Sequence, residues 1–198
     1  GPTIQKSSTV ALNNGMNTSL LFEQLKDLRK ITDVPVVIMG YFNPILQFGI
    51  KKFCKSCKEV GVDGLIIPDL PVDIYNDKYQ KTFKSFGLLN MFLITPQTSQ
   101  RRIKYIDKIS EGFIYMVSSY NVTGAIDSFD SFQKKYFKRI NSMKLKSPLL
   151  VGFGISNKDT FIDAGKYSHG AIIGSAYISW ISENGICKTS DFIKSLKD

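Results

Sequence analysis

Cysteine and histidine are scarce in this chain, whose 198 residues include three cysteines and one histidine. A structural zinc site needs two pairs of ligands, and the pair Cys54-Lys-Ser-Cys57 has no second pair to complete it. Three cysteines without the spacing of a disulfide framework are typical of a reducing cytoplasm. We therefore predict a cytoplasmic protein without a metal site, and we expect the lone His169 to have a structural role.

Long apolar runs are absent as well. No stretch approaches the roughly 18 consecutive apolar residues that a membrane-spanning helix needs. The Gly-x-Gly-x-x-Gly fingerprint between a strand and a helix, which marks dinucleotide-binding folds, is also missing. These absences argue against a membrane protein and against an open, doubly wound dinucleotide-binding sheet.

Acidic residues are in the minority, with 17 Asp and Glu against 26 Lys and Arg, which gives a net charge of +9. A basic chain raises the possibility of nucleic-acid binding. The lysines, however, are spread over several predicted helix faces, as at Lys51, Lys55 and Lys58, and no single basic stripe dominates. We therefore expect a solvated surface that helps to attract anionic substrates, and no nucleic-acid partner.

What the chain does contain is a regular alternation of short apolar runs and helical segments. The runs are nearly continuous, which is typical of parallel strands that are buried on both faces. We predict strands at Val36–Met39, Gly64–Pro68, Met91–Thr95, Phe113–Ser118, Leu149–Phe153 and Ala171–Gly174. Between them, apolar residues recur every three or four positions, which predicts amphipathic helices. Cys54 and Cys57 share this spacing, so we expect both to face the core from one helix.

Apolar spacing marks the predicted helices at Leu21, Leu25 and Leu28, at Tyr79, Phe83 and Phe86, at Ile103, Ile106 and Ile109, and at Phe129, Phe132, Tyr136 and Ile140, with another capped by Ser156. Unbroken strand–helix repetition predicts an α/β fold in a single domain, residues 1–198. Glycines and polar residues follow the ends of the strands, which converge on one mouth in a barrel. We therefore predict a TIM (β/α)8-type barrel in which strands three to eight are present and the first two βα units are missing.

Two glycine-containing turns follow the last two predicted strands. In Gly152-Phe-Gly-Ile-Ser156, a glycine lets a backbone N–H group approach an anion, and Gly174-Ser175 opens a helix whose first N–H groups are free. Either turn alone is explained equally well as an ordinary tight turn. Together, at the ends of the last two strands of a barrel, they predict a site for a phosphate-bearing ligand.

A long loop, residues 118–125, follows the fourth predicted strand. Thr123 supplies a hydroxyl group in this loop, and Gly124 could serve as a hinge. Long ordered loops at the mouth of a barrel often act as lids. An ordinary surface loop is an equally good interpretation of the residues alone.

Several blocks of sequence resemble the tryptophan synthase α subunit, in the family's order and spacing along the whole chain. These blocks are Gly1-Pro-Thr-Ile-Gln5, Gly61-Val-Asp63, Asp69-Leu-Pro71, Val122-Thr-Gly-Ala125, Val151-Gly-Phe-Gly-Ile-Ser156 and Gly174-Ser-Ala176. The resemblance implies an eight-stranded barrel that cleaves indole-3-glycerol phosphate to indole and glyceraldehyde 3-phosphate without cofactor or metal. It also implies a pyridoxal-phosphate-dependent β subunit as partner in an α2β2 heterotetramer.

The resemblance further implies roles for individual residues. The phosphate would be surrounded by Gly124, Phe153, Gly154, Gly174 and Ser175. The indole ring would be enclosed by Met39, Ile66, Pro68, Ile94, Tyr115, Thr123 and Ile172. Asn43 and Asp69 would face the β subunit.

Catalysis in the family that the chain resembles depends on two carboxylates, a glutamate at the end of strand two and an aspartate in the following loop. By this resemblance both would lie upstream of Gly1. We therefore assign no catalytic residue within the chain and expect residues 1–198 alone to be inactive. The alternative is a non-catalytic module that binds a phosphate-bearing ligand or docks on the β subunit.

Overall fold

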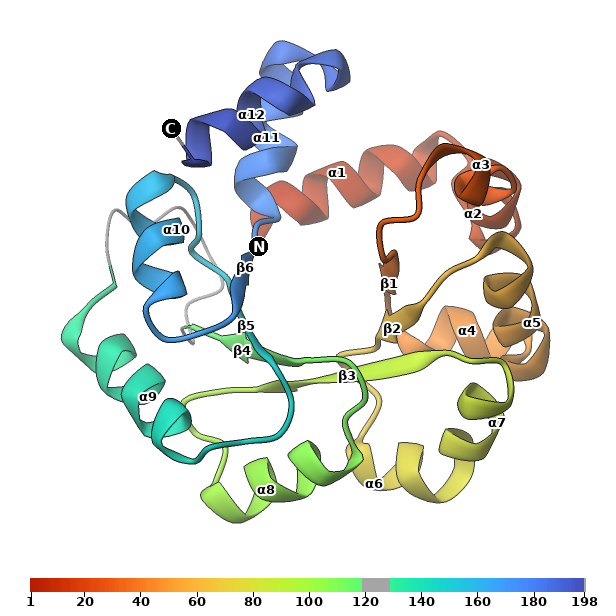
Figure 1. Ribbon diagram of the computed structural model, residues 1–198. Coiled ribbons are helices and arrows are strands. Elements are labelled where there is room, and N and C mark those ends of the chain that lie inside the picture. The colour runs from red at the N-terminus through yellow and green to blue at the C-terminus, as the bar shows by residue number, and fades with distance from the viewer. Residues whose placement is uncertain (119–128, 198) are drawn as a thin grey trace.

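The computed structural model describes residues 1–118 and 129–197, and its centre is one curved sheet of six parallel strands (Figure 1). The strands are β1 (Val37–Met39), β2 (Gly64–Ile66), β3 (Leu89–Ile94), β4 (Ile114–Val117), β5 (Leu149–Gly152) and β6 (Gly170–Ile172). They lie side by side in chain order, and every neighbouring pair is parallel. All six predicted strands are confirmed, and no end differs from its prediction by more than two residues.

The helices form a layer outside the sheet (Figure 1). They are α1 (Pro2–Asn13), α2 (Thr18–Leu25), α3 (Leu28–Ile31), α4 (Phe42–Phe48), α5 (Ile50–Val60), α6 (Val72–Ile74), α7 (Gln80–Ser85), α8 (Gln100–Ile109), α9 (Ser131–Ser142), α10 (Lys158–Gly165), α11 (Ser175–Asn184) and α12 (Thr189–Lys197). A π-helical turn, Tyr75–Tyr79, joins α6 to α7, and a 3-10 turn, Ile186–Lys188, joins α11 to α12.

Several helix boundaries differ from the predictions: Phe129 precedes α9, and Tyr79 and Phe86 flank α7. The segment marked by Leu21, Leu25 and Leu28 is two helices, because α2 ends at Leu25 and Leu28 opens α3. Asn157, and not Ser156, is the N-cap of α10: its side-chain oxygen accepts a hydrogen bond from the Thr160 N–H at 2.9 Å. Serine and asparagine are equally good caps, so composition alone does not choose between neighbours.

The sheet curves into part of a barrel. Figure 1 shows the strands on an arc with an opening between β6 and β1, and α1 runs across this opening. Helix α1 packs against α11, near the β6 end of the arc. Within the part of the chain that the structure describes, β1 and β6 each pair with one neighbour only. The order excludes a doubly wound sheet, in which the strand order reverses at a switch point.

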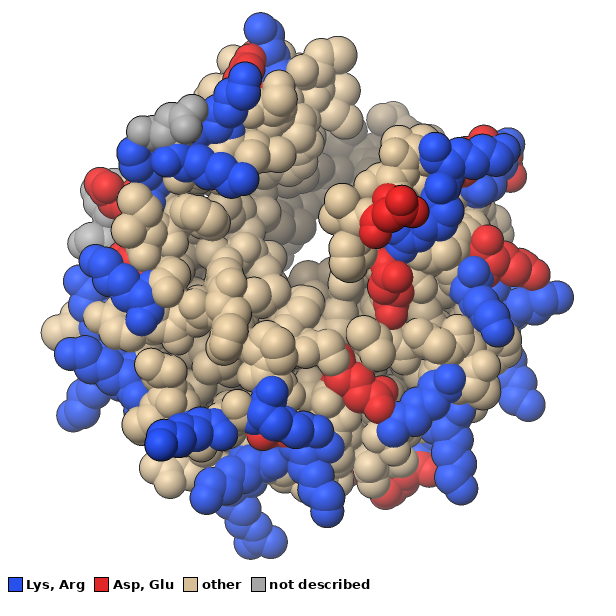
Figure 2. Space-filling view, viewed as in Figure 1, with Lys and Arg blue, Asp and Glu red and all other residues tan. Residues whose placement is uncertain are grey.

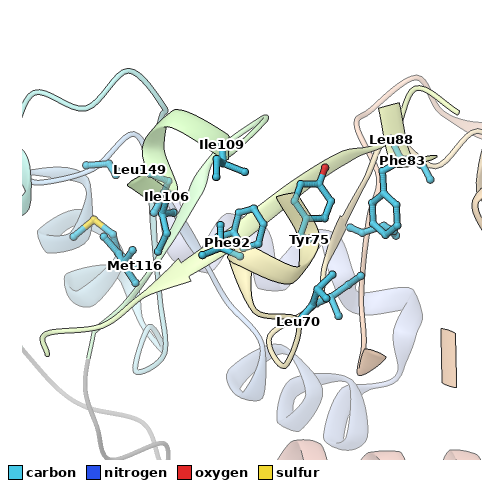
Figure 3. Packing of buried hydrophobic residues seen from close by; sticks show 14 of the residues in the cluster. Leu70, Tyr75, Phe83, Leu88, Phe92, Ile106, Ile109, Met116 and Leu149 are labelled. Carbon is cyan, nitrogen blue, oxygen red and sulfur yellow. The ribbon is translucent and has the colours of Figure 1, made fainter. Parts of the chain in front are cut away.

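Apolar side chains on the two faces of the sheet form two separate clusters, because successive residues of a strand point to opposite faces. The larger cluster lies between the strands and the helices, where Tyr75 packs edge-on against Phe83 and Phe92 with ring centroids 5.4 and 5.3 Å apart (Figure 3). The smaller cluster lies on the inner face and is built from Ile66, Met91, Tyr115 and Val117. Strands β2 to β5 therefore have buried residues on both faces, as nearly continuous apolar strands require, whereas β1 and β6 are only partly buried or exposed.

Basic side chains lie mainly around the periphery of the face in Figure 2, over the outer helices. The middle of this face is mostly uncharged, so the positive charge does not form a single stripe across it. No helix of the described segments combines the length and apolarity that crossing a bilayer requires.

The Cys54 and Cys57 thiols are fully buried on α5, as expected from their spacing, whereas Cys187 is exposed. Burial raises the pKa of Cys54 to about 11 and that of Cys57 to about 12. Because the thiolate is the reactive form, we expect a maleimide at pH 8 to modify one thiol per native chain, and three after denaturation. Rapid modification of two or three thiols in the native state, measured by mass spectrometry, would contradict this packing.

Candidate functional site

A cavity of about 380 Å³ opens where β4, β5 and β6 end and where the first turn of α1 approaches them. Its lining residues are Gly1, Pro2, Thr3, Ile4, Met39, Tyr115, Phe153, Gly154, Ile155, Ser156, Ile172, Gly174, Ser175, Ala176 and Ser179. None of these described lining residues carries a carboxylate, a histidine or a thiol. The cavity therefore offers apolar surface, hydroxyl groups and backbone N–H groups, a set that suits a ligand with both an apolar part and an anionic part.

The turn after β5 has an unusual backbone. Phe153 has a φ of 67° and Gly154 a φ of 80°, so two consecutive residues are left-handed. For phenylalanine this conformation costs on the order of 1–3 kcal/mol and persists only where the surroundings hold it. Two contacts do so: the Phe153 ring packs against Tyr115 with centroids 5.8 Å apart, and the Ser118 hydroxyl donates a hydrogen bond to the Phe153 carbonyl oxygen at 2.5 Å.

The second turn leads from β6 into α11. Gly174 is the N-cap of this ten-residue helix, and no side chain caps it. The N–H groups of Gly154, Gly174 and Ser175 donate to no acceptor within the described part of the chain. Since all three residues line the same cavity, its wall carries free donors beside the positive end of a helix dipole.

Tyr115 forms the apolar wall on the side of β4. Only 5% of its surface is exposed, and burial raises the pKa of its phenol to about 12, so the hydroxyl is neutral at physiological pH. The ring lies over Gly152, where any β-carbon would overlap the tyrosine hydroxyl. Met39 and Ile172 continue the apolar lining.

Comparison with known proteins shows the family. The family model for the tryptophan synthase alpha chain matches residues 1–197. The chain is 60% identical to the tryptophan synthase alpha chain of Flavobacterium psychrophilum over 196 residues, which are 99% of this chain and 78% of the relative. The chain belongs to the tryptophan synthase alpha chain family. Members of this family are lyases of tryptophan biosynthesis.

Other relatives and solved structures are also similar to this chain over nearly its whole length. The tryptophan synthase alpha chain of Bacteroides thetaiotaomicron is 47% identical over 98% of this chain and 78% of its own length. A chain from a solved structure of the tryptophan synthase α2β2 complex of Pyrococcus furiosus superposes with a TM-score of 0.87 at 31% identity, covering 100% of this chain and 79% of the other. A structure from Aquifex aeolicus gives a TM-score of 0.86 at 31% identity, over 100% and 74% of the two chains.

Seven of the residues that the family resemblance singled out line the cavity together: Met39, Tyr115, Phe153, Gly154, Ile172, Gly174 and Ser175. Ile66 lies in the adjoining inner cluster, beside Tyr115. Thr123 and Gly124 lie outside the described residues.

Two of the predicted indole-pocket residues lie elsewhere. Ile94 belongs to the cluster between sheet and helices, where its carbonyl accepts a hydrogen bond from the Tyr136 hydroxyl at 3.2 Å. The neighbouring Leu93 packs against the inner cluster instead, because strand residues alternate between faces. Pro68 lines a separate cavity of about 180 Å³, together with Leu93.

The two residues predicted to face a partner lie at the ends of neighbouring strands. The Asp69 carboxylate, in the loop after β2, accepts a hydrogen bond from the Phe42 N–H at 2.9 Å and so caps the start of α4. Asn43 follows in the first turn of that helix, and both side chains are exposed. Asp69 therefore ties the loop after β2 to the loop after β1.

Eight lining residues were not predicted from the sequence: Gly1, Pro2, Thr3, Ile4, Ile155, Ser156, Ala176 and Ser179. All except Ser179 lie within motifs that the resemblance includes, but none was expected to contact the ligand. Ser179 lies one helical turn after Ser175, so the spacing of four residues along α11 was the available signal. Within residues 1–118 and 129–197, no group of three or more metal-ligating side chains is placed to hold a metal ion.

The contact between Gly152 and Tyr115 predicts the effect of adding one methyl group. In Gly152→Ala the new methyl displaces the Tyr115 ring, and we expect a loss of about 1–3 kcal/mol of stability. Gly165→Ala is the matched control, because nothing lies within 4 Å of its added methyl at the end of α10. Its unfolding midpoint in urea should be unchanged or raised. Equal midpoints for the two variants would show that the ring does not fill this position.

Proposed function

We propose that this protein cleaves indole-3-glycerol phosphate to indole and glyceraldehyde 3-phosphate, with the cavity at the ends of β4, β5 and β6 as its substrate site. The observation that carries the proposal is that one cavity combines an apolar wall with free backbone N–H groups. The apolar wall suits a flat apolar ring, and the N–H groups suit a phosphate group. Membership of a family of lyases supports the reaction class.

In this proposal, Gly154, Gly174 and Ser175 donate backbone N–H groups to the phosphate, beside Phe153. Gly124 keeps the role near the phosphate that the resemblance implies. Met39, Ile66, Tyr115 and Ile172 enclose the indole ring, with Leu93 in the place first given to Ile94. Thr123 keeps the role in the indole pocket that the resemblance implies. Burial of Leu93 against the inner cluster supports this exchange. Pro68 is left out, because its side chain is exposed in the loop after β2 and lines the cavity of about 180 Å³, whereas Leu93 also packs against the inner cluster.

The chemistry also needs acids and bases that the described lining lacks. A proton must reach the indole ring at C3, and protons must leave the ring nitrogen and a glycerol hydroxyl. We propose that two further βα units fill the opening between β6 and β1, complete an eight-stranded barrel with this domain, and supply both catalytic carboxylates. In the described part of the chain, β1 and β6 each pair with one neighbouring strand only, and this supports the proposal.

The partner follows from the rim of the barrel. The Pyrococcus furiosus neighbour is an α2β2 complex, and we propose the same assembly here, with Asn43 and Asp69 facing the pyridoxal-phosphate-dependent β subunit. Both side chains are exposed at the carboxyl ends of β1 and β2, where a partner can reach them. We place the assembly in the cytoplasm, in line with free thiols on the chain.

A second candidate function is a non-catalytic module that binds a phosphate-bearing ligand or docks on the β subunit. The lack of any carboxylate among the described cavity residues favours it for residues 1–198 taken alone. It predicts phosphate-ester binding without turnover, whereas the lyase hypothesis predicts turnover once both carboxylates are present.

Indole release tests the lyase proposal. We expect the full-length protein, by which we mean this domain together with the two proposed βα units, to release indole from indole-3-glycerol phosphate, and residues 1–198 alone to release none. Each positioned acid or base contributes about 10²–10⁴-fold in rate. The rate of indole release that remains without both groups should therefore lie far below detection. Binding of glycerol 3-phosphate by either protein, without indole release by the full-length one, would favour the non-catalytic module. Indole release by residues 1–198 would show that the catalytic groups lie within them.

Charge at the start of α11 tests the phosphate site separately. Ser175→Asp adds a negative charge beside the free N–H groups, and we expect affinity for glycerol 3-phosphate to fall about tenfold. Ser175→Asn is the control, since it has the same size without the charge. Calorimetric titration should show the loss for aspartate but not for asparagine. Equal affinities in the two variants would place the phosphate elsewhere.

A further inference from the structure

We propose that Ser118 is a positioning residue that directs the Gly154 N–H group toward the substrate phosphate, an inference that rests on the proposed function. Ser118 directly follows β4 and is fully buried. Its N–H donates to the Gly152 carbonyl oxygen at 3.1 Å, and its hydroxyl donates to the Phe153 carbonyl oxygen at 2.5 Å. The residue after β4 therefore holds two consecutive carbonyl groups where β5 ends and the turn that contains Phe153 and Gly154, here called the phosphate turn, begins.

The geometry of the peptide bond transmits this contact. The Phe153 carbonyl and the Gly154 N–H belong to one planar peptide group, and the described chain contains no cis peptide bond. In a trans peptide the C=O and N–H bonds point in opposite directions. A hydrogen bond that fixes the carbonyl toward the buried hydroxyl of Ser118 therefore fixes the N–H away from it. That N–H donates to no acceptor in the described part of the chain, and Gly154 lines the cavity.

The backbone of the turn explains why an anchor is needed. Phe153 is held in a left-handed conformation that phenylalanine disfavours, and Gly154, as a glycine, accepts many conformations at little cost. Without the hydroxyl, the peptide between the two residues is free to rotate and to turn its N–H group away. The contact with Tyr115 holds the Phe153 ring but does not set the direction of the carbonyl.

A serine at the other end of β4 offers a matched control for Ser118. Ser110 precedes β4 and is 4% exposed, and its hydroxyl donates to the Phe113 carbonyl oxygen at 3.2 Å. Ser110→Ala and Ser118→Ala each remove one buried serine hydroxyl that bonds a backbone carbonyl. The two serines lie at opposite ends of β4: Ser118 is next to the phosphate turn, and Ser110 is far from it. A purely structural role would give both variants the same phenotype.

The experiment uses the full-length protein and two probes, glycerol 3-phosphate and indole, which the proposed site binds through different walls. For Ser118→Ala we expect affinity for glycerol 3-phosphate to fall about tenfold, since one hydrogen bond to a charged group is lost. Indole affinity should stay unchanged, and the KM for indole-3-glycerol phosphate should rise more than kcat falls. Ser110→Ala should bind both probes as the wild type does, and Ser118→Thr, which keeps the hydroxyl, should recover much of the phosphate affinity.

The outcomes separate the two claims. If the wild type does not bind glycerol 3-phosphate, the proposed phosphate site fails and the positioning role fails with it. If the wild type binds and Ser118→Ala binds equally well, or loses both probes in parallel with Ser110→Ala, the positioning role alone is overturned. Should Ser118→Thr not fold, the comparison between the two alanine variants still decides.

Discussion

Because β4, β5 and β6 pair in parallel and in register, their carboxyl ends stop at one level of the sheet. Val117 pairs with Gly152, and Gly152 pairs with Ile172, so a single row of residues closes all three strands. The residues after this row emerge together: Ser118 reaches across to Phe153, and α11 begins shortly after Ile172. The cavity exists because the strands are parallel, since antiparallel pairing would bring a carboxyl end beside an amino end at each pair.

The proposed phosphate site is built mainly from backbone groups. Its described lining has no lysine or arginine, although the chain carries a net charge of +9. Free N–H groups at the start of a helix can bind an anion without the help of a cationic side chain, provided that the backbone is held rigidly. The strained Phe153 conformation and the buried Ser118 hydroxyl belong to this requirement, because a backbone donor is useful only in a fixed direction. We expect the basic surface to add attraction for an anionic ligand at longer range.

The sequence was most informative where a pattern was local. Nearly continuous apolar runs predicted all six strands, and the glycine turns predicted the wall with Gly154 and Gly174. A continuous run does not reveal which residues face inward. The family resemblance gave Ile94 as a pocket residue, whereas Ile94 lies in the cluster between sheet and helices and Leu93 packs inward. Contacts between distant segments left no local signal at all. Ile4 on α1 approaches Gly174 so closely that a β-carbon added to this glycine would lie 3.3 Å from the Ile4 side chain, and this approach depends on the curvature of the sheet.

The central claim, that backbone amides of the turns after β5 and β6 bind phosphate, is tested most directly by NMR on the protein. Titration with glycerol 3-phosphate should move the amide resonances of Gly154, Gly174 and Ser175 together, with one dissociation constant. The amides of Gly61 and Gly112, in turns that precede β2 and β4, serve as internal references and should stay in place. Saturable shifts confined to other residues, with the three cavity amides unmoved, would contradict the account.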